Sequence, residues 1–282
     1  MISKIKIPMS QPASDSDTEN YMFDVIKSGW WSQGKITKQF EKNLSEYFPS
    51  NVVVVNNGTS AITAALLAHG IKPGDKVVVP DYTFIATCSA AKIIGAEILV
   101  ADVDPNTLNV KPQSIEKLVK ENDVKAVMVV DMAGLPVDLE PIIELSKRYK
   151  FVLIEDAAQA IGSEYKNKKI GSFEHTSTFS FTAAKIITTI EGGCITTGNK
   201  DILEKLFQIR NFGRSGDGQY VHILNSVNFR FNDIQAALGI KQLEQINKFI
   251  ARRIEIAKMY EENIENVTFQ HIPDYTTIHS HM

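Results

Sequence analysis

The sequence is poor in cysteine and has no long hydrophobic run. Cys88 and Cys194 are its only cysteines, too few for a disulfide framework and in keeping with a reducing compartment. The apolar runs are too short and too interrupted by charge to span a bilayer. Residues 1–17 lack the continuous apolar core and small-residue cleavage site of a signal peptide. We therefore predict a cytoplasmic protein without a membrane-spanning segment.

An excess of one charge and several familiar motifs are also missing. The 30 basic and 33 acidic residues give a formal net charge of −3 and no dense basic stripe, which argues against nucleic-acid binding by charge. There is no Gly-rich dinucleotide fingerprint and no Walker loop, which opposes a nicotinamide-dependent oxidoreductase. The six histidines show no metal-ligand spacing. We predict no metal site and expect His279 and His281 on the surface.

The sequence does contain a regular alternation of short apolar runs and helical-period segments from about residue 50 onward. With 282 residues, 44% of them hydrophobic, it can form one large domain and part of another. Strands separated by helices are expected at 52–55, 76–80, 96–102, 125–131 and 151–156. Because these strands are apolar throughout, they predict an α/β fold with a mainly parallel sheet covered on both faces. Ligands of such sheets bind at the carboxyl ends of the strands.

The pattern changes after residue 156. We expect a hairpin at 167–172, strands at 176–181 and 192–198, and one long helix over about residues 232–263. The last residues begin a strand-like pattern without a closing element. We therefore predict a large domain at 1–250 and the start of a small C-terminal domain at 251–282, incomplete where the chain stops.

The first segment suited to chemistry is NNGTS, residues 56–60, between a predicted strand and a helix. Gly58 permits a tight turn, and Thr59 and Ser60 offer hydroxyls beside the free N–H groups of the helix start. Such a start carries roughly +0.5 of a charge and suits a phosphate. An ordinary helix cap, for which Ser and Thr are favoured, is the open alternative.

The second segment is FVLIEDAAQAIG, in which Glu155 and Asp156 end a buried strand. A carboxylate there is costly unless it meets a positive partner. The protonated ring nitrogen of pyridoxal phosphate would be such a partner. A helix cap at Asp156 is the open alternative.

The third segment is TFSFTAAKIITTIEGG, where Lys185 lies among apolar residues. Desolvation lowers the pKa of a lysine, which suits Schiff-base chemistry with a carbonyl. Ser180, at a strand end in the same segment, could reach a phosphate. A lysine that extends its amine to solvent is the open alternative.

In this order, GTS, then DAAQ, then FSF followed by a lysine and EGG, the segments resemble the DegT/DnrJ/EryC1/StrS family of sugar aminotransferases. The stretches SGWWSQG, KPGDKVVVPDYTFIAT, DVDPNTLNV, AGLPVD and NFRFNDIQAALG are similar to further family landmarks. The resemblance covers almost the whole chain and implies a fold type I pyridoxal-phosphate fold. It implies a homodimer with shared active sites that moves an amino group, with glutamate as donor, to a nucleotide-linked keto-sugar.

The resemblance also assigns roles by position. Lys185 would hold pyridoxal phosphate covalently, and Asp156 would pair with the pyridine nitrogen. Gln159 would bond the ring hydroxyl, and Phe84 would stack on the ring. The phosphate would be held by Thr59, Ser60 and Ser180, together with Asn228 from the neighbouring subunit.

The chain departs from the family in two places. Ser226 and Val227 stand where the family has Gly-Tyr, so the loop between subunits can differ. Family members also continue past the point where this chain stops, which would leave the substrate site impaired. A truncated or non-catalytic relative that binds pyridoxal phosphate or a sugar is therefore one alternative. A sugar dehydratase is another, although a histidine replaces the lysine in those relatives and position 185 is lysine.

Overall fold

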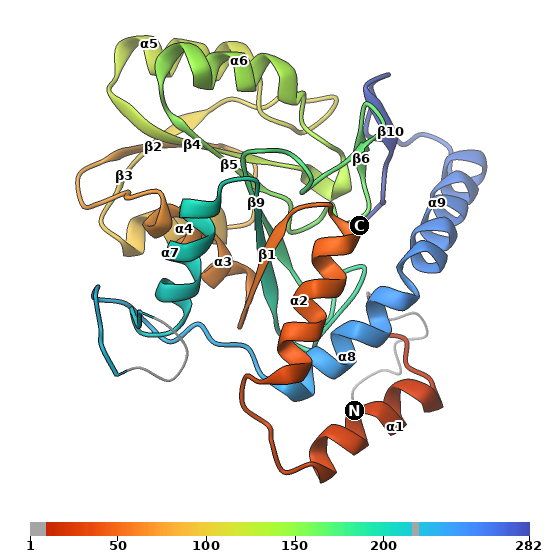
Figure 1. Cartoon of the computed structure of the whole chain (residues 1–282). Coiled ribbons are helices and arrows are strands. Elements are labelled where there is room, and N and C mark those ends of the chain that lie inside the picture. Colours follow the sequence, from red (N-terminus) through yellow and green to blue (C-terminus); the bar gives the residue numbers. More distant parts are fainter. Residues whose placement is uncertain (1–9, 216–219) are drawn as a thin grey trace, which may run out of the picture.

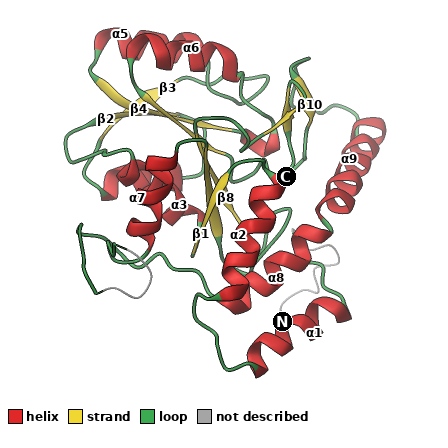
Figure 2. Cartoon of the chain, in the orientation of Figure 1, coloured by secondary structure: helices red, strands yellow, loops and turns green. Residues whose placement is uncertain are grey.

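The computed structural model describes residues 10–215 and 220–282, which form a seven-stranded sheet flanked by helices (Figures 1 and 2). The start of the segment considered for a signal peptide lies outside the described residues. The strand order is β1-β9-β8-β5-β4-β2-β3, and only β9 runs antiparallel to its neighbours. This confirms the predicted α/β fold with a mainly parallel sheet. The strands are Asn51–Val55 (β1), Lys76–Pro80 (β2), Glu97–Ala101 (β3), Val124–Val130 (β4), Val152–Asp156 (β5), Thr176–Ser180 (β8) and Gly193–Thr197 (β9).

Strand β1 shows how the sequence builds two core layers. Val52 and Val54 pack into one hydrophobic cluster, and Val53 and Val55 pack into the other. Alternate side chains of a strand point to opposite faces, so a run of valines is buried on both sides. The first layer is covered by α2 (Lys35–Tyr47), α5 (Pro112–Glu121) and α6 (Leu139–Tyr149), and the second by α3 (Gly58–Ala68), α4 (Ala86–Ile93) and α7 (Lys200–Arg210).

The single long helix expected over residues 232–263 is wrong, because the structure divides it at Gln245. The two pieces are α8 (Asp233–Glu244) and α9 (Ile246–Asn263). The Gln245 N–H bonds to the Gln242 carbonyl at 3.1 Å, a tighter turn than an α-helix makes. Gln245 Nε2 also reaches Asp15 Oδ2 at 3.3 Å, at the start of α1 (Ser16–Lys27). Figure 1 shows α8 between α1 and α2, while α9 continues at an angle to α8 toward the side of the molecule where the last strand lies.

The C-terminal residues form one strand of a second, small three-stranded sheet. A hairpin forms three residues earlier than the predicted 167–172, from β6 (Glu164–Tyr165) and β7 (Lys168–Lys169), and β10 (Thr276–Ile278) pairs antiparallel with β6. His279 is only 8% exposed, so its predicted place on the surface is wrong; it lies where the chain turns inward after β10. The predicted domain boundary at residue 250 falls inside α9, and the division into two domains stays a prediction.

Within residues 10–215 and 220–282, no helix is long and apolar enough to cross a membrane.

Candidate active site

One cavity of about 460 Å³ gathers most of the predicted residues at the carboxyl ends of β5 and β8. The start of α3 closes it on one side, and the loop that follows β8 closes it on another. This is the edge at which ligands of parallel sheets bind. The predicted residues that line it are Thr59, Phe84, Asp156, Gln159, Ser180 and Lys185.

The start of α3 forms an anion-binding end of this cavity. Asn57 caps the helix, its Oδ1 accepting from the Ser60 N–H at 2.8 Å. The N–H groups of Gly58 and Thr59 have no carbonyl within the helix to bind. A Cβ on Gly58 would lie 2.9 Å from the Ser180 Cβ, so only glycine lets the helix start approach Ser180 this closely. The result is a set of N–H and hydroxyl donors at a helix dipole, which suits a phosphate.

Ser60 does not line the cavity. It is only 6% exposed, and its N–H is the one taken by the Asn57 cap. A direct role for Ser60 in phosphate binding stays a prediction.

Asp156 supplies a buried carboxylate at the end of β5. Its Oδ2 accepts from Thr87 Oγ1 at 2.6 Å, and its Oδ1 accepts from the Ala158 N–H at 3.2 Å. Burial raises the pKa of the Asp156 carboxyl, while these two bonds and the charge of Lys185 oppose the rise. A carboxylate so placed is stabilised when a cation enters the cavity.

Lys185 brings an amine to the same cavity from the loop after β8. Burial lowers the pKa of this amine, and the negative charge of Asp156 opposes that effect. Its Nζ lies 3.3 Å from the Sδ atom of Met282, which also lines the cavity. The side chain is partly rather than fully buried, so the amine can meet an incoming carbonyl.

Gln159 is held in a fixed orientation by a tight turn at residues 132–134. Its Oε1 accepts from the Ala133 N–H at 2.8 Å, which leaves its amide N–H groups to face a ligand. Ala133 has a positive φ of 56°, a strained value for a non-glycine residue. The Ala133 carbonyl in turn accepts from the Met282 N–H at 3.0 Å and faces His279 Nε2 at 3.1 Å.

Two residues of the predicted motifs lie elsewhere. Glu155 turns to the opposite face of β5, where its Oε2 accepts from Ser177 Oγ at 2.6 Å and lies 3.2 Å from His175 Nε2. Asn228 is exposed, does not line the cavity, and pairs in a backbone bridge with Asn211. Asn228 was predicted to act in the cavity of the neighbouring subunit. Its absence from the cavity of its own chain therefore does not test that prediction.

Sequence reasoning missed several residues of the cavity wall. Thr87, which bonds Asp156, lies one turn past Thr83, and their hydroxyls are 2.8 Å apart. Both belong to the segment PDYTFIAT, in which Phe84 alone was singled out. Glu191 also lines the cavity and accepts from Thr182 Oγ1 at 3.1 Å. A carboxylate two residues before a sheet strand could have been interpreted as a ligand group, as Asp156 was.

The groups present match the chemistry of pyridoxal phosphate. Phosphate donors, a buried carboxylate, an amine with a lowered pKa and an exposed aromatic ring, Phe84, line one cavity. Its volume is typical of small-ligand sites. Within the described residues, no group of three or more His, Cys, Asp or Glu side chains could hold a metal ion.

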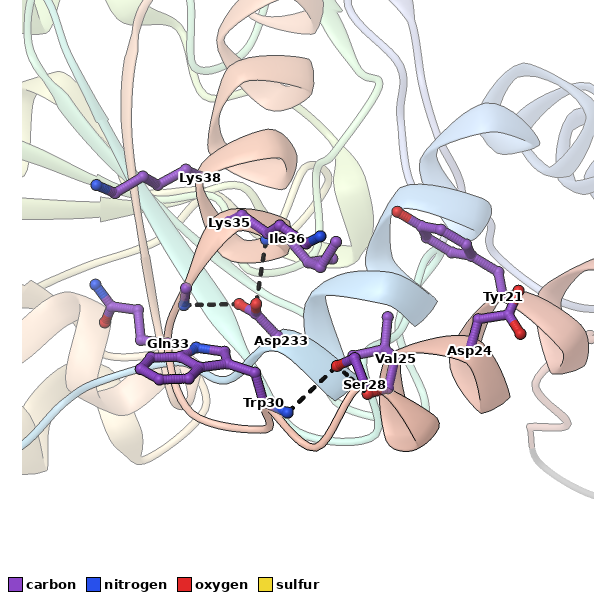
Figure 3. A pocket seen from close by; sticks show the side chains of 11 residues that line it. Tyr21, Asp24, Val25, Ser28, Trp30, Gln33, Lys35, Ile36, Lys38 and Asp233 are labelled. Carbon is purple, nitrogen blue, oxygen red and sulfur yellow. Dashed lines mark hydrogen bonds between the residues drawn. The ribbon is translucent and has the colours of Figure 1, made fainter.

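A larger cavity of about 840 Å³ lies between α1, α2 and the start of α8 (Figure 3). Asp233 lines this cavity and binds the start of α2. Its Oδ1 accepts from the N–H groups of Gly34 at 2.8 Å and Thr37 at 2.9 Å. Its Oδ2 accepts from the Ile36 N–H at 3.2 Å. The carboxylate therefore caps α2 from another helix, and none of the predicted site residues lies in this cavity.

Known proteins resemble this chain over nearly its whole length. Residues 12–282 match the model of the DegT/DnrJ/EryC1/StrS aminotransferase family. A GDP-perosamine synthase of Escherichia coli O157:H7 is 38% identical over 277 residues, 98% of this chain and 76% of that protein. A UDP-4-amino-4,6-dideoxy-N-acetyl-beta-L-altrosamine transaminase of Campylobacter jejuni is 38% identical over 267 residues, 92% of this chain and 70% of that protein.

A solved structure, that of 3-amino-5-hydroxybenzoic acid synthase, has the same architecture. It matches with a TM-score of 0.92 at 30% identity, over 98% of this chain and 74% of that one. Other matching structures include the pyridoxal-phosphate and pyridoxamine-phosphate forms of a putative sugar aminotransferase of Streptococcus pneumoniae. These matches confirm the predicted fold type I architecture.

Proposed function

The chain belongs to the DegT/DnrJ/EryC1/StrS aminotransferase family, and from this membership we propose that it converts a nucleotide-linked keto-sugar into an amino sugar. Glutamate is the proposed amino donor, and pyridoxal phosphate, on which the family depends, is the proposed cofactor. The observation that carries the proposal is the cavity in which Lys185 and Asp156 meet the phosphate donors of α3. The names of the relatives, which include a GDP-sugar and a UDP-sugar enzyme, support the substrate class.

We propose the following roles for the residues that line the cavity. Thr59, Ser180 and the first N–H groups of α3 bind the phosphate, as helix starts do. Phe84 packs on the ring, and Gln159, held by Ala133, donates to the ring hydroxyl. Ser60 supports this end of the cavity through the Asn57 cap.

Pyridoxal phosphate supplies a carbonyl that accepts an amino group and a ring that takes up electron density. Asp156 would keep the ring nitrogen protonated, because its carboxylate is buried and, within residues 10–215 and 220–282, Lys185 is the one cation that acts on it. With the cofactor bound, Lys185 Nζ would be the group that takes up and returns the proton moved during amino transfer, as a general base and then a general acid. Burial helps, because it lowers the pKa of this amine and so favours its neutral, basic form.

The proposal includes a homodimer in which Asn228 of one subunit completes the phosphate site of the other. Its exposed position, away from its own cavity, supports this arrangement. A cytoplasmic location is also proposed, and both cysteines are free thiols.

Absorbance spectra of the purified protein with pyridoxal phosphate test the function. Glutamate should convert the cofactor to its amine form, and a nucleotide-linked keto-sugar should then restore the original spectrum. A protein that only binds would take up the cofactor and show no change with glutamate. A dehydratase is not favoured, because Lys185 occupies the position of the histidine in those relatives.

A further inference from the structure

A second cavity, of about 500 Å³, adjoins the one that contains Asp156. The two share Ala184, Lys185 and Met282 as lining residues. The second cavity extends from Lys185 toward residues 10–13 and the first half of α9. It is therefore a route by which a large substrate could extend away from the reacting amine. The Gln242 side chain holds the lining residues near the N-terminus in place, since Gln242 Nε2 donates to the Ala13 carbonyl at 2.7 Å.

The wall of this second cavity is cationic. Lys185, Arg252 and Arg253 line it, and none of its described lining residues is an Asp or Glu. This is notable in a chain whose formal net charge is −3. Such a lining favours an anion, because it carries positive side chains and no carboxylate.

The two arginines differ in the partners they already have. Arg252 Nη1 lies 2.6 Å from Glu255 Oε2, with the side chain 58% exposed. Arg253 is partly buried, and its Nη1 donates to the His281 carbonyl at 2.9 Å. Within residues 10–215 and 220–282 it has no carboxylate partner, and burial lowers the pKa of its guanidinium. A guanidinium has five N–H donors, so most of those on Arg253 are left for a ligand.

We propose that this second cavity binds the diphosphate of the nucleotide-linked sugar and that Arg253 is its anchoring cation. The inference rests on the proposed function, which supplies the substrate class. Arginine binds phosphate oxygens through two parallel N–H groups and is the side chain best matched to them. Ser10 and Gln11, which also line the cavity, add neutral donors.

The position of Arg253 favours the diphosphate over the carboxylates of glutamate. The α-carboxylate of glutamate sits two bonds from the nitrogen that reacts, so its site must lie in the cavity of Lys185 and Asp156. Arg253 does not line that cavity. A diphosphate is separated from the reacting carbon by a sugar ring, which matches a cation in the neighbouring cavity.

Calorimetric titration of the protein loaded with pyridoxal phosphate tests this site, with GDP and UDP as probes. Arg253→Met keeps the aliphatic stem and should weaken binding of the preferred diphosphate about 10- to 100-fold, the loss typical of one charged hydrogen-bonding group. Arg253→Lys keeps the charge, and its affinity for the diphosphate should lie between those of the parent and Arg253→Met. Lys248→Met removes a charge from the same helix, outside all these cavities, and should bind within about twofold of the parent.

The glutamate response, followed by absorbance, separates this site from the function itself. Arg253→Met should respond to glutamate within about twofold of the parent, because the amino donor does not reach the second cavity. The proposal is overturned if neither diphosphate binds the parent, if the Arg253 variants bind as tightly as the parent, or if the glutamate response falls as far as diphosphate binding. Should Arg253→Met not fold, unchanged affinity of Arg253→Lys overturns it. Failure of the proposed function would appear instead as a parent protein that does not respond to glutamate.

Discussion

At the scale of single residues, Asp156 and Lys185 have opposite requirements that a bound cofactor would satisfy together. Burial raises the pKa of the Asp156 carboxyl and lowers the pKa of the Lys185 amine, so each charged form is disfavoured by its surroundings. Each opposes the shift of the other by its charge. A cation beside Asp156 would keep it ionised, and a covalent bond to Lys185 would remove the cost of its charge.

Asp156→Asn should keep the cofactor but lose transamination, because a neutral amide cannot hold the ring nitrogen protonated. We expect turnover at least about 100-fold below the parent, equivalent to roughly 2.7 kcal/mol in the barrier. Stopped-flow absorbance after glutamate addition measures it. Asp81→Asn removes an exposed carboxylate at the end of β2 and serves as the matched control. Turnover of Asp156→Asn near the parent rate would rule out this role.

Lys185 should be the residue that holds pyridoxal phosphate covalently. Borohydride reduction would make the link permanent, and peptide mapping should then place the label on the peptide containing Lys185. The Lys185→Ala variant, treated in the same way, should carry no label. A label on another lysine, or none in the parent, would contradict the assignment.

The sequence predicted the cavity's main residues because they follow strands whose ends must meet at one edge. It did not predict their supports. Thr87 bonds Asp156 across 69 residues, and Ala133 bonds Gln159 across 26. Thr87 lies in the first turn of α4 and Ala133 in the turn after β4, and no local pattern marks a threonine or an alanine as such a partner. Lys185 is also less buried than its apolar neighbours indicated, because it follows the strand on an open loop.

At the scale of elements, the carboxylate of Asp233 joins α8 to α2 through the cap described above (Figure 3). It is 1% exposed, so its removal leaves the buried Thr37 N–H and the partly buried N–H groups of Gly34 and Ile36 without this acceptor. Asp233→Ala should lower the free energy of unfolding by about 2–3 kcal/mol. Urea denaturation measures this. Asp24→Ala, an exposed carboxylate on the wall of the same cavity, should change it by less than about 0.5 kcal/mol, and equal losses would contradict the capping role.

Most strands of the sheet and the helices that cover it were predictable, because burial on both faces of the sheet determines their pattern of apolar residues. The break at Gln245 was not, since the apolar spacing continues through it. Tertiary contacts make the break: α8 is buried along most of its length, whereas α9 buries only Ile246 and Ile250. The pairing of β10 with β6 could not be predicted either, because β6 lies more than one hundred residues earlier in the chain.

The outer half of α9 and the loop after it should be the first part of the chain to be cut by protease. Residues 255–272 are mostly exposed, and local opening is easiest where few apolar groups are buried. Limited proteolysis with mass spectrometry should find the first cleavage there and leave a core that retains pyridoxal phosphate. A first cut within residues 58–215, or resistance of 255–272 equal to that of the core, would contradict this expectation.

At the scale of the whole molecule, large apolar side chains remain exposed around the cavity. Phe84, which lines the cavity, is 69% exposed, its chain neighbour Ile85 67%, and Ile190, next to the lining residue Glu191, 58%. Single exposed apolar residues are ordinary, but several on one side of a site are typical of an interaction surface. A second copy of the chain would cover them, as the proposed homodimer requires. The proposed homodimer also gives a role to Asn228, which does not line the cavity of its own chain.

A mixing experiment tests whether the site is shared between two subunits. Neither Lys185→Ala nor Asn228→Ala should be active alone, because every site of such a dimer lacks one essential group. If the two are unfolded together and refolded, a mixed dimer has one site with the intact Lys185 of one chain and the intact Asn228 of the other. Random pairing makes half of the dimers mixed, so activity should return to roughly a quarter of the parent value under the two-fold symmetry of a homodimer. Mixing Lys185→Ala with Asp156→Asn is the matched control, since both residues line the cavity of one chain and no mixed dimer gains an intact site. Recovery in both mixtures, or in neither when the refolded parent is active, would show that Asn228 does not act across the interface.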